Sequence, residues 1–210
     1  MVVRGWVMAL FTLNNVVCNN LIHYPDLTIM PQLVTFICGE SGSGKSTLLK
    51  LLNGMISADR GVVTYQGKDI QAWDPVFLHR AVILGGQSPY LFDLSVKDNF
   101  LEFYHYRELQ PVSEPEMSEY LRLCALECPL EASCGTMSGG EKQRVFLALC
   151  LSLKPEVLLL DEPTSALDAH NAAVVLSNIK DYCRTNQITL LVVSHSKELS
   201  ETLADEVINL

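Results

Sequence analysis

The sequence predicts an α/β fold in which a mostly parallel β-sheet forms the core, with an antiparallel β side sheet and a helical subdomain attached. Three observations lead to this prediction. Several short apolar runs are continuous rather than alternating, a Gly/Ser-rich loop joins one of them to a helix-like segment, and strand signals are absent from one central stretch. Continuous apolar strands are typical of parallel sheets covered on both faces. The 210 residues, 49% of them hydrophobic, suffice for one globular domain and exclude intrinsic disorder.

The first strands of the chain are expected to be antiparallel. Residues 9–17 and 61–65 are bounded by turn residues, so we expect them to pair in the side sheet. Residues 5–25 contain no Asp, Glu, Lys or Arg, which also fits a membrane-spanning segment or a signal peptide. We favour a β-strand preceded by a tail, because five polar side chains would otherwise need partners in hydrocarbon. These are Asn14, Asn15, Asn19, Asn20 and His23.

Four apolar runs are candidates for strands of the core sheet, namely residues 33–38, 80–84, 157–160 and 188–193. The first of these runs leads through the Gly/Ser-rich loop into residues 46–53, which have a helical pattern. The sequence ends on residues 207–210, around the expected last strand of the sheet. We expect any regulation to come from partners or from the substrate.

The stretch from Val96 to Met137 is expected to be helical. Prolines punctuate helix-like segments there, such as residues 116–127. We therefore expect one domain over residues 1–210, made of two parts. Residues 9–95 and 138–210 form the core with its β subdomain, and residues 96–137 form the helical subdomain.

Charge and cysteine content limit the partners. The 24 acidic residues exceed the 15 Lys and Arg, giving a net charge of -9, which argues against nucleic acid as the main partner. The seven cysteines are odd in number and lie mostly in apolar runs, so we interpret them as reduced thiols of a cytosolic protein. Cys124, Cys128 and Cys134 cluster, but no His or second Cys pair lies near enough to favour a metal site.

The loop Gly39–Ser46 (GESGSGKS) matches the phosphate-binding pattern G-x-x-x-x-G-K-[ST]. Its glycines let backbone N–H groups surround phosphate oxygens, Lys45 reaches the terminal phosphates, and the Ser46 hydroxyl can ligate Mg²⁺. The alternative is a plain Gly/Ser turn. The residues assigned to nucleotide binding are Gly39, Glu40, Ser41, Gly42, Ser43, Gly44, Lys45, Ser46 and Thr47.

Two adjacent carboxylates end the apolar run at residues 157–160. Asp161 is the candidate on the metal side, and Glu162 is the candidate general base for the attacking water. Alone this pattern is weak, because strands often end on a solvated charge. The phosphate-binding loop in the same chain strengthens it.

Ser138–Arg144 (SGGEKQR) lies 92 residues after Ser46 and 17 before Asp161. It resembles the signature motif of ATP-binding cassette (ABC) ATPases. Ser138, Gly139 and Gly140 would sit at a helix start, where unpaired N–H groups and the helix dipole bind an anion. The same residues fit an ordinary capping box with Glu141, and both interpretations can hold at once.

The resemblance covers Ala9 to Leu210 and implies the P-loop NTPase core of an ABC ATPase. Gln87 resembles the glutamine that contacts Mg²⁺ and the attacking water, Asp168 ends a segment that crosses to the opposing subunit, and His195 resembles the histidine that contacts the γ-phosphate. The catalytic set is then Lys45, Gln87, Glu162 and His195. The metal set is Ser46, Gln87 and Asp161. Ser138, Gly139, Gly140 and Asp168 complete the nucleotide site.

The resemblance also implies partners. Two copies meet head to tail, ATP bound to one is closed over by Ser138–Gly140 of the other, and this closure powers transport through a separate transmembrane permease. Pro89–Phe92 are candidate permease contacts. The chain is then a Mg²⁺-dependent ATPase, cytoplasmic and peripheral on the inner face of the cell membrane. The alternative is a soluble ABC-type ATPase in cluster assembly or repair. The direction of transport stays open.

The family usually places an aromatic residue near Asn20, to stack on adenine, and this sequence has none there. Tyr24 or His23 could reach round instead, or adenine could be held loosely. Met137 stands where Leu commonly precedes the signature serine, an exchange of similar volume.

Overall fold

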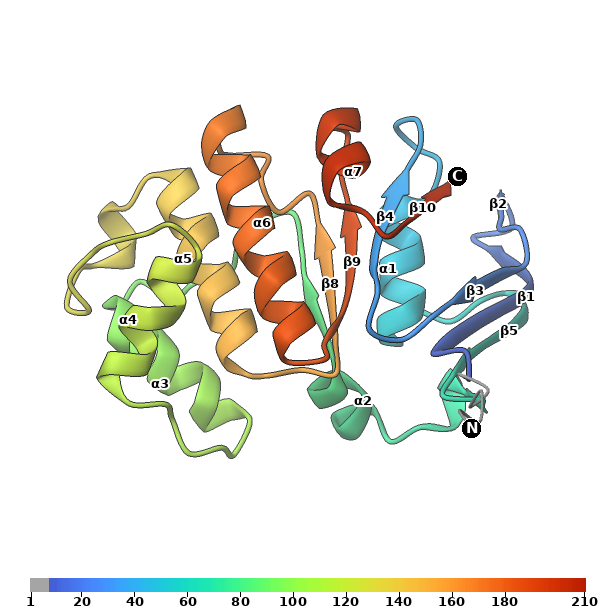
Figure 1. Cartoon of the computed structure of the whole chain (residues 1–210). Coiled ribbons are helices and arrows are strands. Elements are labelled where there is room, and N and C mark those ends of the chain that lie inside the picture. Colours follow the sequence, from blue (N-terminus) through green and yellow to red (C-terminus); the bar gives the residue numbers. More distant parts are fainter. Residues whose placement is uncertain (1–7) are drawn as a thin grey trace, which may run out of the picture.

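The strands form two sheets, one parallel and one antiparallel (Figure 1). The computed structural model describes residues 8–210, and the expected tail before residue 8 lies outside them. Every pairing in the core sheet of the described chain is parallel, so the predicted α/β class with a parallel core is confirmed. Its order is β10-β4-β9-β8-β7. The bounds are β4 (Val34–Cys38), β7 (Val82–Gly85), β8 (Val157–Asp161), β9 (Thr189–Val193) and β10 (Glu206–Asn209).

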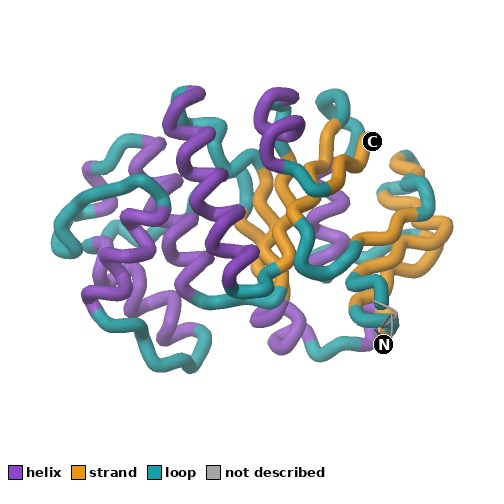
Figure 2. Tube along the Cα trace, viewed as in Figure 1, coloured by secondary structure: helices purple, strands orange, loops and turns teal. Residues whose placement is uncertain are grey.

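The core strands are buried on both faces. In β8, Val157 and Leu159 join one hydrophobic cluster, whereas Leu158 and Leu160 join another on the opposite face. Successive side chains of a strand point to opposite faces, which explains why the run is continuously apolar. The first cluster includes residues of α1 (Lys45–Asn53), which lies between the two sheets. The second includes residues of the helices on the other side of the core sheet (Figure 2).

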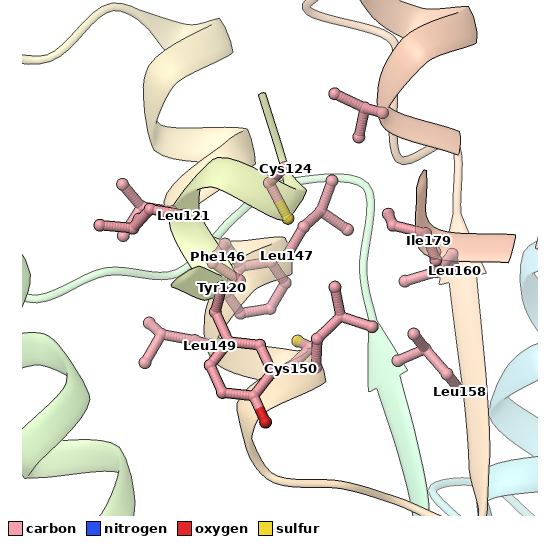
Figure 3. Packing of buried hydrophobic residues seen from close by; sticks show 14 of the residues in the cluster. Tyr120, Leu121, Cys124, Phe146, Leu147, Leu149, Cys150, Leu158, Leu160 and Ile179 are labelled. Atoms are coloured by element: carbon pink, nitrogen blue, oxygen red, sulfur yellow. The ribbon is translucent and has the colours of Figure 1, made fainter. Parts of the chain in front are cut away.

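The helices of that second face are α3 (Val96–Tyr106), α4 (Glu114–Leu123), α5 (Gly139–Ser152), α6 (Ala169–Thr185) and α7 (Lys197–Leu203). Tyr120 and Leu121 of α4 and Phe146 of α5 belong to one cluster with buried thiols (Figure 3). Burial raises the pKa of the Cys124 thiol above its usual range and that of Cys150 to about 12. These two cysteines therefore stay protonated and act as apolar packing groups.

The strand expected at residues 80–84 is wrong in its first two residues. Arg80 and Ala81 end a helix, α2 (Pro75–Ala81), and the strand β7 begins at Val82. Asp74 starts this helix, because its carboxylate accepts a hydrogen bond from the Phe77 N–H at 2.9 Å. The helix expected at residues 116–127 is α4, which begins at Glu114 and ends at Leu123. It begins earlier than expected because Ser113 and Glu116 form a capping box at its start.

The side sheet contains β1 (Phe11–Cys18), β2 (Ile22–His23), β3 (Leu27–Ile29), β5 (Arg60–Tyr65) and β6 (Lys68–Asp69). The predicted antiparallel pairing of the first strand with the strand at residues 61–65 is confirmed. Its register shifts between Asn14 and Val17, and Gly61 opposite this bulge has a φ of +82°. Two short 3₁₀ helices, η1 (Ile70–Ala72) and η2 (Cys134–Thr136), complete the described elements.

Gly61→Ala is expected to destabilise the protein by about 2–4 kcal/mol. A β-carbon at Gly61 would lie 2.3 Å from the Asn15 carbonyl oxygen and 2.5 Å from that of Asn14. Gly86→Ala is the matched control, because a β-carbon there meets no atom within 4 Å. Urea unfolding measures both free energies. Equal unfolding midpoints for the two variants would contradict this account.

Candidate nucleotide-binding site

The loop between β4 and α1 is built for close backbone approach. Gly42 and Gly44 have φ values of +84° and +97°, which favour glycine. A β-carbon at Gly39 would lie 2.4 Å from the Leu210 carbonyl oxygen. No side chain caps the first turn of α1, so its N–H groups face the loop without a side-chain acceptor. This is the arrangement that binds phosphate at a helix N-terminus.

The ammonium group of Lys45 lies across this loop. It donates hydrogen bonds to the carbonyl oxygens of Gly39 (3.0 Å) and Glu40 (2.7 Å), and the residue is only 6% exposed. Both acceptors are neutral, so no carboxylate neutralises the lysine through these bonds. An anion that enters the loop therefore meets a positive charge that is already in place.

Glu162 follows β8 and has a φ of +49°, a left-handed conformation that is uncommon for a residue with a side chain. Its backbone N–H donates to the Val193 carbonyl at 3.1 Å. The Gln87 amide donates to Glu162 Oε2 at 3.2 Å, and His195 Nε2 lies 3.0 Å from Oε1. Both carboxylate oxygens thus have partners, which fixes the direction of the group.

Asp161 is the last residue of β8 and is 8% exposed. Its Oδ1 is buried and has no hydrogen-bond partner among the described residues. Val193 of β9 pairs with Asp161 of β8 on one side and with Ile37 of β4 on the other. Asp161 therefore lies at the same end of the sheet as the start of the phosphate-binding loop, which follows β4. A buried carboxylate oxygen without a donor favours a cation beside it.

These elements surround one pocket of about 320 Å³. Most of the residues predicted from the sequence line it, so the structure brings them together. The lining consists of Ile22, Ser41, Gly42, Gly44, Lys45, Ser46, Thr47, Gln87, Glu162 and His195. Ile22 is a lining residue that sequence reasoning missed, because nothing in a two-residue strand identifies it as part of a site.

The other predicted residues do not line this pocket. Ser138 caps α5, and its hydroxyl and backbone N–H bond to Glu141 Oε2 at 2.7 and 2.9 Å, so the expected capping box is present. Gly140 packs against Ala166, whose carbonyl oxygen would lie 3.0 Å from a β-carbon at Gly140. Asp168 caps α6, and hydrogen bonds from Asn171 hold the pKa of that carboxyl below its usual value.

Tyr24 supports the phosphate-binding loop rather than offering a stacking face. Its ring is buried, and its hydroxyl donates to the Gly44 carbonyl oxygen at 2.8 Å. His23 is exposed. Asn20 has a φ of +54°, and its N–H donates to Asp59 Oδ2 at 2.9 Å. No Phe, Tyr or Trp side chain belongs to the pocket lining within residues 8–210.

A family model described as "ABC transporter" matches residues 22–165, well over half of the chain. The chain belongs to this ABC transporter family. It is 38% identical over 174 residues to the probable iron export ATP-binding protein FetA of Escherichia coli, covering 83% of this chain and 77% of FetA. The predicted membership of the ABC family and the predicted ATPase activity of the chain are thereby confirmed.

Further comparisons agree with the family assignment. The chain is 37% identical over 198 residues to the phosphate import ATP-binding protein PstB of Saccharolobus solfataricus, covering 87% of this chain and 76% of PstB. It also superposes on a bacterial Atm1-family ABC exporter with ATP bound, with a TM-score of 0.85 at 25% identity, covering 97% of this chain and 38% of that one. An ABC-type ATPase unlinked to transport is therefore not favoured.

Tyr24→Phe is expected to lower the free energy of unfolding by about 1 kcal/mol, because the Gly44 carbonyl loses its hydroxyl donor. Tyr106→Phe is the control, since Tyr106 is 71% exposed. Thermal or urea unfolding of the two variants checks the difference. A loss as large in the control would mean that the hydroxyl of Tyr24 has no special role.

Proposed function

We propose that this chain hydrolyses ATP in the pocket between Gly39–Thr47 and Glu162, and that hydrolysis powers a permease formed by other chains. The observation that carries this proposal is the orientation of Glu162, whose carboxylate is held by Gln87 and His195 in the same pocket as Lys45. A general base must be fixed within reach of the water that attacks the terminal phosphate.

Each residue of the pocket has a distinct role in this mechanism. The loop N–H groups and Lys45 hold the triphosphate and offset the charge that spreads over the transferred group. Glu162 orients the attacking water and takes its proton. Gln87 and His195 position the carboxylate, and His195 also contacts the terminal phosphate.

The residues present also fit Mg²⁺, a cation that prefers oxygen ligands. The buried Asp161 Oδ1 has no partner among the described residues, and Asp161 immediately precedes Glu162, which lines the pocket together with Ser46 and Gln87. Ser46, Gln87 and Asp161 would hold the ion. When bound, Mg²⁺ neutralises negative charge on the phosphate oxygens.

A second copy of the chain completes the site. Ser138, Gly139 and Gly140 lie at the start of α5 but do not line the pocket of their own chain. A helix start of this kind binds anions, so it can close over ATP that is bound to the opposing copy. Asp168 is assigned to the same surface, through which the two copies meet. Dimer formation then depends on ATP, because the nucleotide is shared.

The permease docks beside Gln87. A groove of about 320 Å³ is lined there by Pro89, Leu91, Phe92, Asp93, Cys134, Gly135 and Lys142, and Tyr90 next to it is 64% exposed. Within residues 8–210, no helix is long and apolar enough to cross a membrane. The chain acts on the inner face of the cell membrane, where cytoplasmic ATP is available. FetA is named for export and PstB for import, so these relatives assign no direction.

We also propose the division into a core with β subdomain (residues 9–95 and 138–210) and a helical subdomain (residues 96–137). Two hydrogen bonds support it by joining the ends of the helical part. Val96 N–H donates to the Ala132 carbonyl and Cys134 N–H donates to the Leu94 carbonyl, each at 2.9 Å. The insertion therefore leaves and re-enters the core at one place.

Glu162→Gln is expected to reduce ATP turnover by about 10²–10⁴-fold while ATP binding persists, because only the base is lost. With ATP and Mg²⁺ the variant should accumulate as a dimer, measured by light scattering beside the turnover of the parent. Glu201→Gln, an exposed residue of α7, is the matched control. Turnover of Glu162→Gln at the parent rate would refute the assignment of the base.

Ser138→Arg is expected to abolish turnover yet leave ATP affinity of the monomer unchanged, because Ser138 does not line the pocket of its own chain. Titration with ATP and steady-state turnover measure the two effects separately. Ser57→Arg, at another exposed serine, controls for the added charge. Loss of ATP binding in the monomer of Ser138→Arg would rule out a site shared between two copies.

A further inference from the structure

Asn99 of α3 is a polar side chain buried in the helical part of the chain, and the mechanism proposed above does not use it. The residue is 0% exposed, and Val96 and Phe100 beside it in α3 belong to a hydrophobic cluster. Burying an amide is costly unless its donors and its acceptor find partners. The partners of Asn99 therefore show which segments it holds in place.

These partners lie in two separate segments. The Asn99 amide oxygen accepts a hydrogen bond from the Phe92 N–H at 2.8 Å, and its nitrogen donates to the Phe92 carbonyl oxygen at 3.1 Å. The same nitrogen donates to the Ser95 carbonyl oxygen at 2.9 Å and to the Cys134 sulfur at 3.4 Å. One side chain thus holds both backbone groups of Phe92 and also reaches Cys134, 35 residues further along the chain.

The two segments lead to residues with assigned roles. Phe92 follows Gln87 by five residues, and Cys134 precedes Ser138 by four. The 3₁₀ helix η2 contains Cys134, and only Met137 separates its end from Ser138, the cap of α5. A displacement of Cys134 therefore moves the start of α5.

The same segments also meet at the surface. An isolated antiparallel bridge joins Ser95 to Ser133, and a β-carbon on Gly135 would clash with the Asp93 carboxylate. Water competes for exposed hydrogen bonds of this kind. The contact between Asn99 and the buried Cys134 lies away from solvent, where a hydrogen bond is electrostatically stronger.

The start of α5 must be oriented before two copies meet, because Ser138 is assigned to ATP that the opposing copy holds. The capping box with Glu141 fixes the Ser138 hydroxyl within α5, but it does not fix α5 relative to Gln87. If only a fraction of molecules has the required orientation, the apparent dissociation constant of the dimer rises by the inverse of that fraction. A contact that sets this orientation in advance therefore favours closure.

We propose that Asn99 is a positioning residue for the ATP site shared by two copies. By holding Phe92 and Cys134 together, it fixes the start of α5, and with it Ser138, relative to Gln87 of the same chain. This inference rests on the proposed function, since it takes Ser138 as part of the opposing copy's site. Asn99 does not line the nucleotide pocket of its own chain, so it acts on dimer formation rather than on ATP binding by the monomer.

The test compares Cys134→Ala with Cys134→Ser, because these side chains have nearly equal size and only serine offers an acceptor to the Asn99 amide. Burial raises the pKa of the Cys134 thiol, so the native acceptor is a protonated sulfur, which accepts weakly. In the Glu162→Gln background with ATP and Mg²⁺, light scattering measures the dissociation constant of the dimer. Cys134→Ala is expected to raise this constant by about 3- to 10-fold, and Cys134→Ser to stay within about twofold of the parent.

A second readout separates positioning from general stability. The ATP affinity of the monomer is expected to stay unchanged in both variants, because Cys134 does not line the nucleotide pocket. With Glu162 present, Cys134→Ala should lower kcat at a fixed chain concentration and leave KM for ATP nearly unchanged. Cys134→Ser should restore kcat. Urea unfolding of each variant measures the free energy of unfolding beside these constants.

Asn99→Ala removes every contact of the amide and is expected to weaken the dimer by about tenfold or more. In that background, Cys134→Ala and Cys134→Ser should give equal dissociation constants, because the donor that distinguishes them is gone. Cys183→Ala and Cys183→Ser are the matched control. Cys183 of α6 is also buried, and burial alone raises the pKa of its thiol to about 12. Both control variants should dimerise as the parent does.

Equal dimer dissociation constants for Cys134→Ala and Cys134→Ser would overturn this inference and leave the proposed function standing. Weaker ATP binding by the monomer of Cys134→Ala, in proportion to the loss of dimer, would also overturn it. Failure of the Glu162→Gln parent to form a dimer with ATP and Mg²⁺ would remove the shared site of the proposed function, and this inference with it.

Discussion

The parallel register of the core sheet is the constraint on which the site depends. Val193 of β9 pairs with Ile37 on one side and with Asp161 on the other, so the ends of β4 and β8 stop at one level. Strands buried on both faces cannot slip by one residue without moving polar groups into the two hydrophobic clusters. The phosphate-binding loop and the Glu162 carboxylate are therefore positioned by the packing of the core strands.

That register alone does not orient Glu162. The residue lies just beyond the last paired position of β8, and its left-handed backbone is held by a hydrogen bond to Val193. Gln87 and His195 then fix the two carboxylate oxygens from the neighbouring strands β7 and β9. Three strand ends cooperate to hold one group, which is how a strained backbone conformation persists at a functional site.

The contiguous motifs of the site could be predicted from the sequence, whereas one helix boundary and one supporting contact between distant segments could not. The loop Gly39–Ser46 and the capped start of α5 are contiguous in the chain, so their spacing alone identifies them. The start of β7 differs from the prediction because Arg80 and Ala81 are the last residues of α2, a helix that the Asp74 cap begins only a few residues earlier. The hydrogen bond from Tyr24 to Gly44 spans 20 residues, and no periodicity in the sequence indicates it.

The uneven chemistry of the pocket follows from what hydrolysis requires. The reaction occurs at the terminal phosphate, so charge, donors and a fixed base must gather there, where a small displacement is costly. The adenine ring of the nucleotide takes no part in bond breaking, so that end of the pocket need only contribute contact area. The hairpin that bears Ile22 belongs to the side sheet and contacts the phosphate-binding loop at Gly44, through Ile22 and the Tyr24 hydroxyl. Different elements therefore form the two ends of the pocket, since Gln87, Glu162 and His195 follow strands of the core sheet.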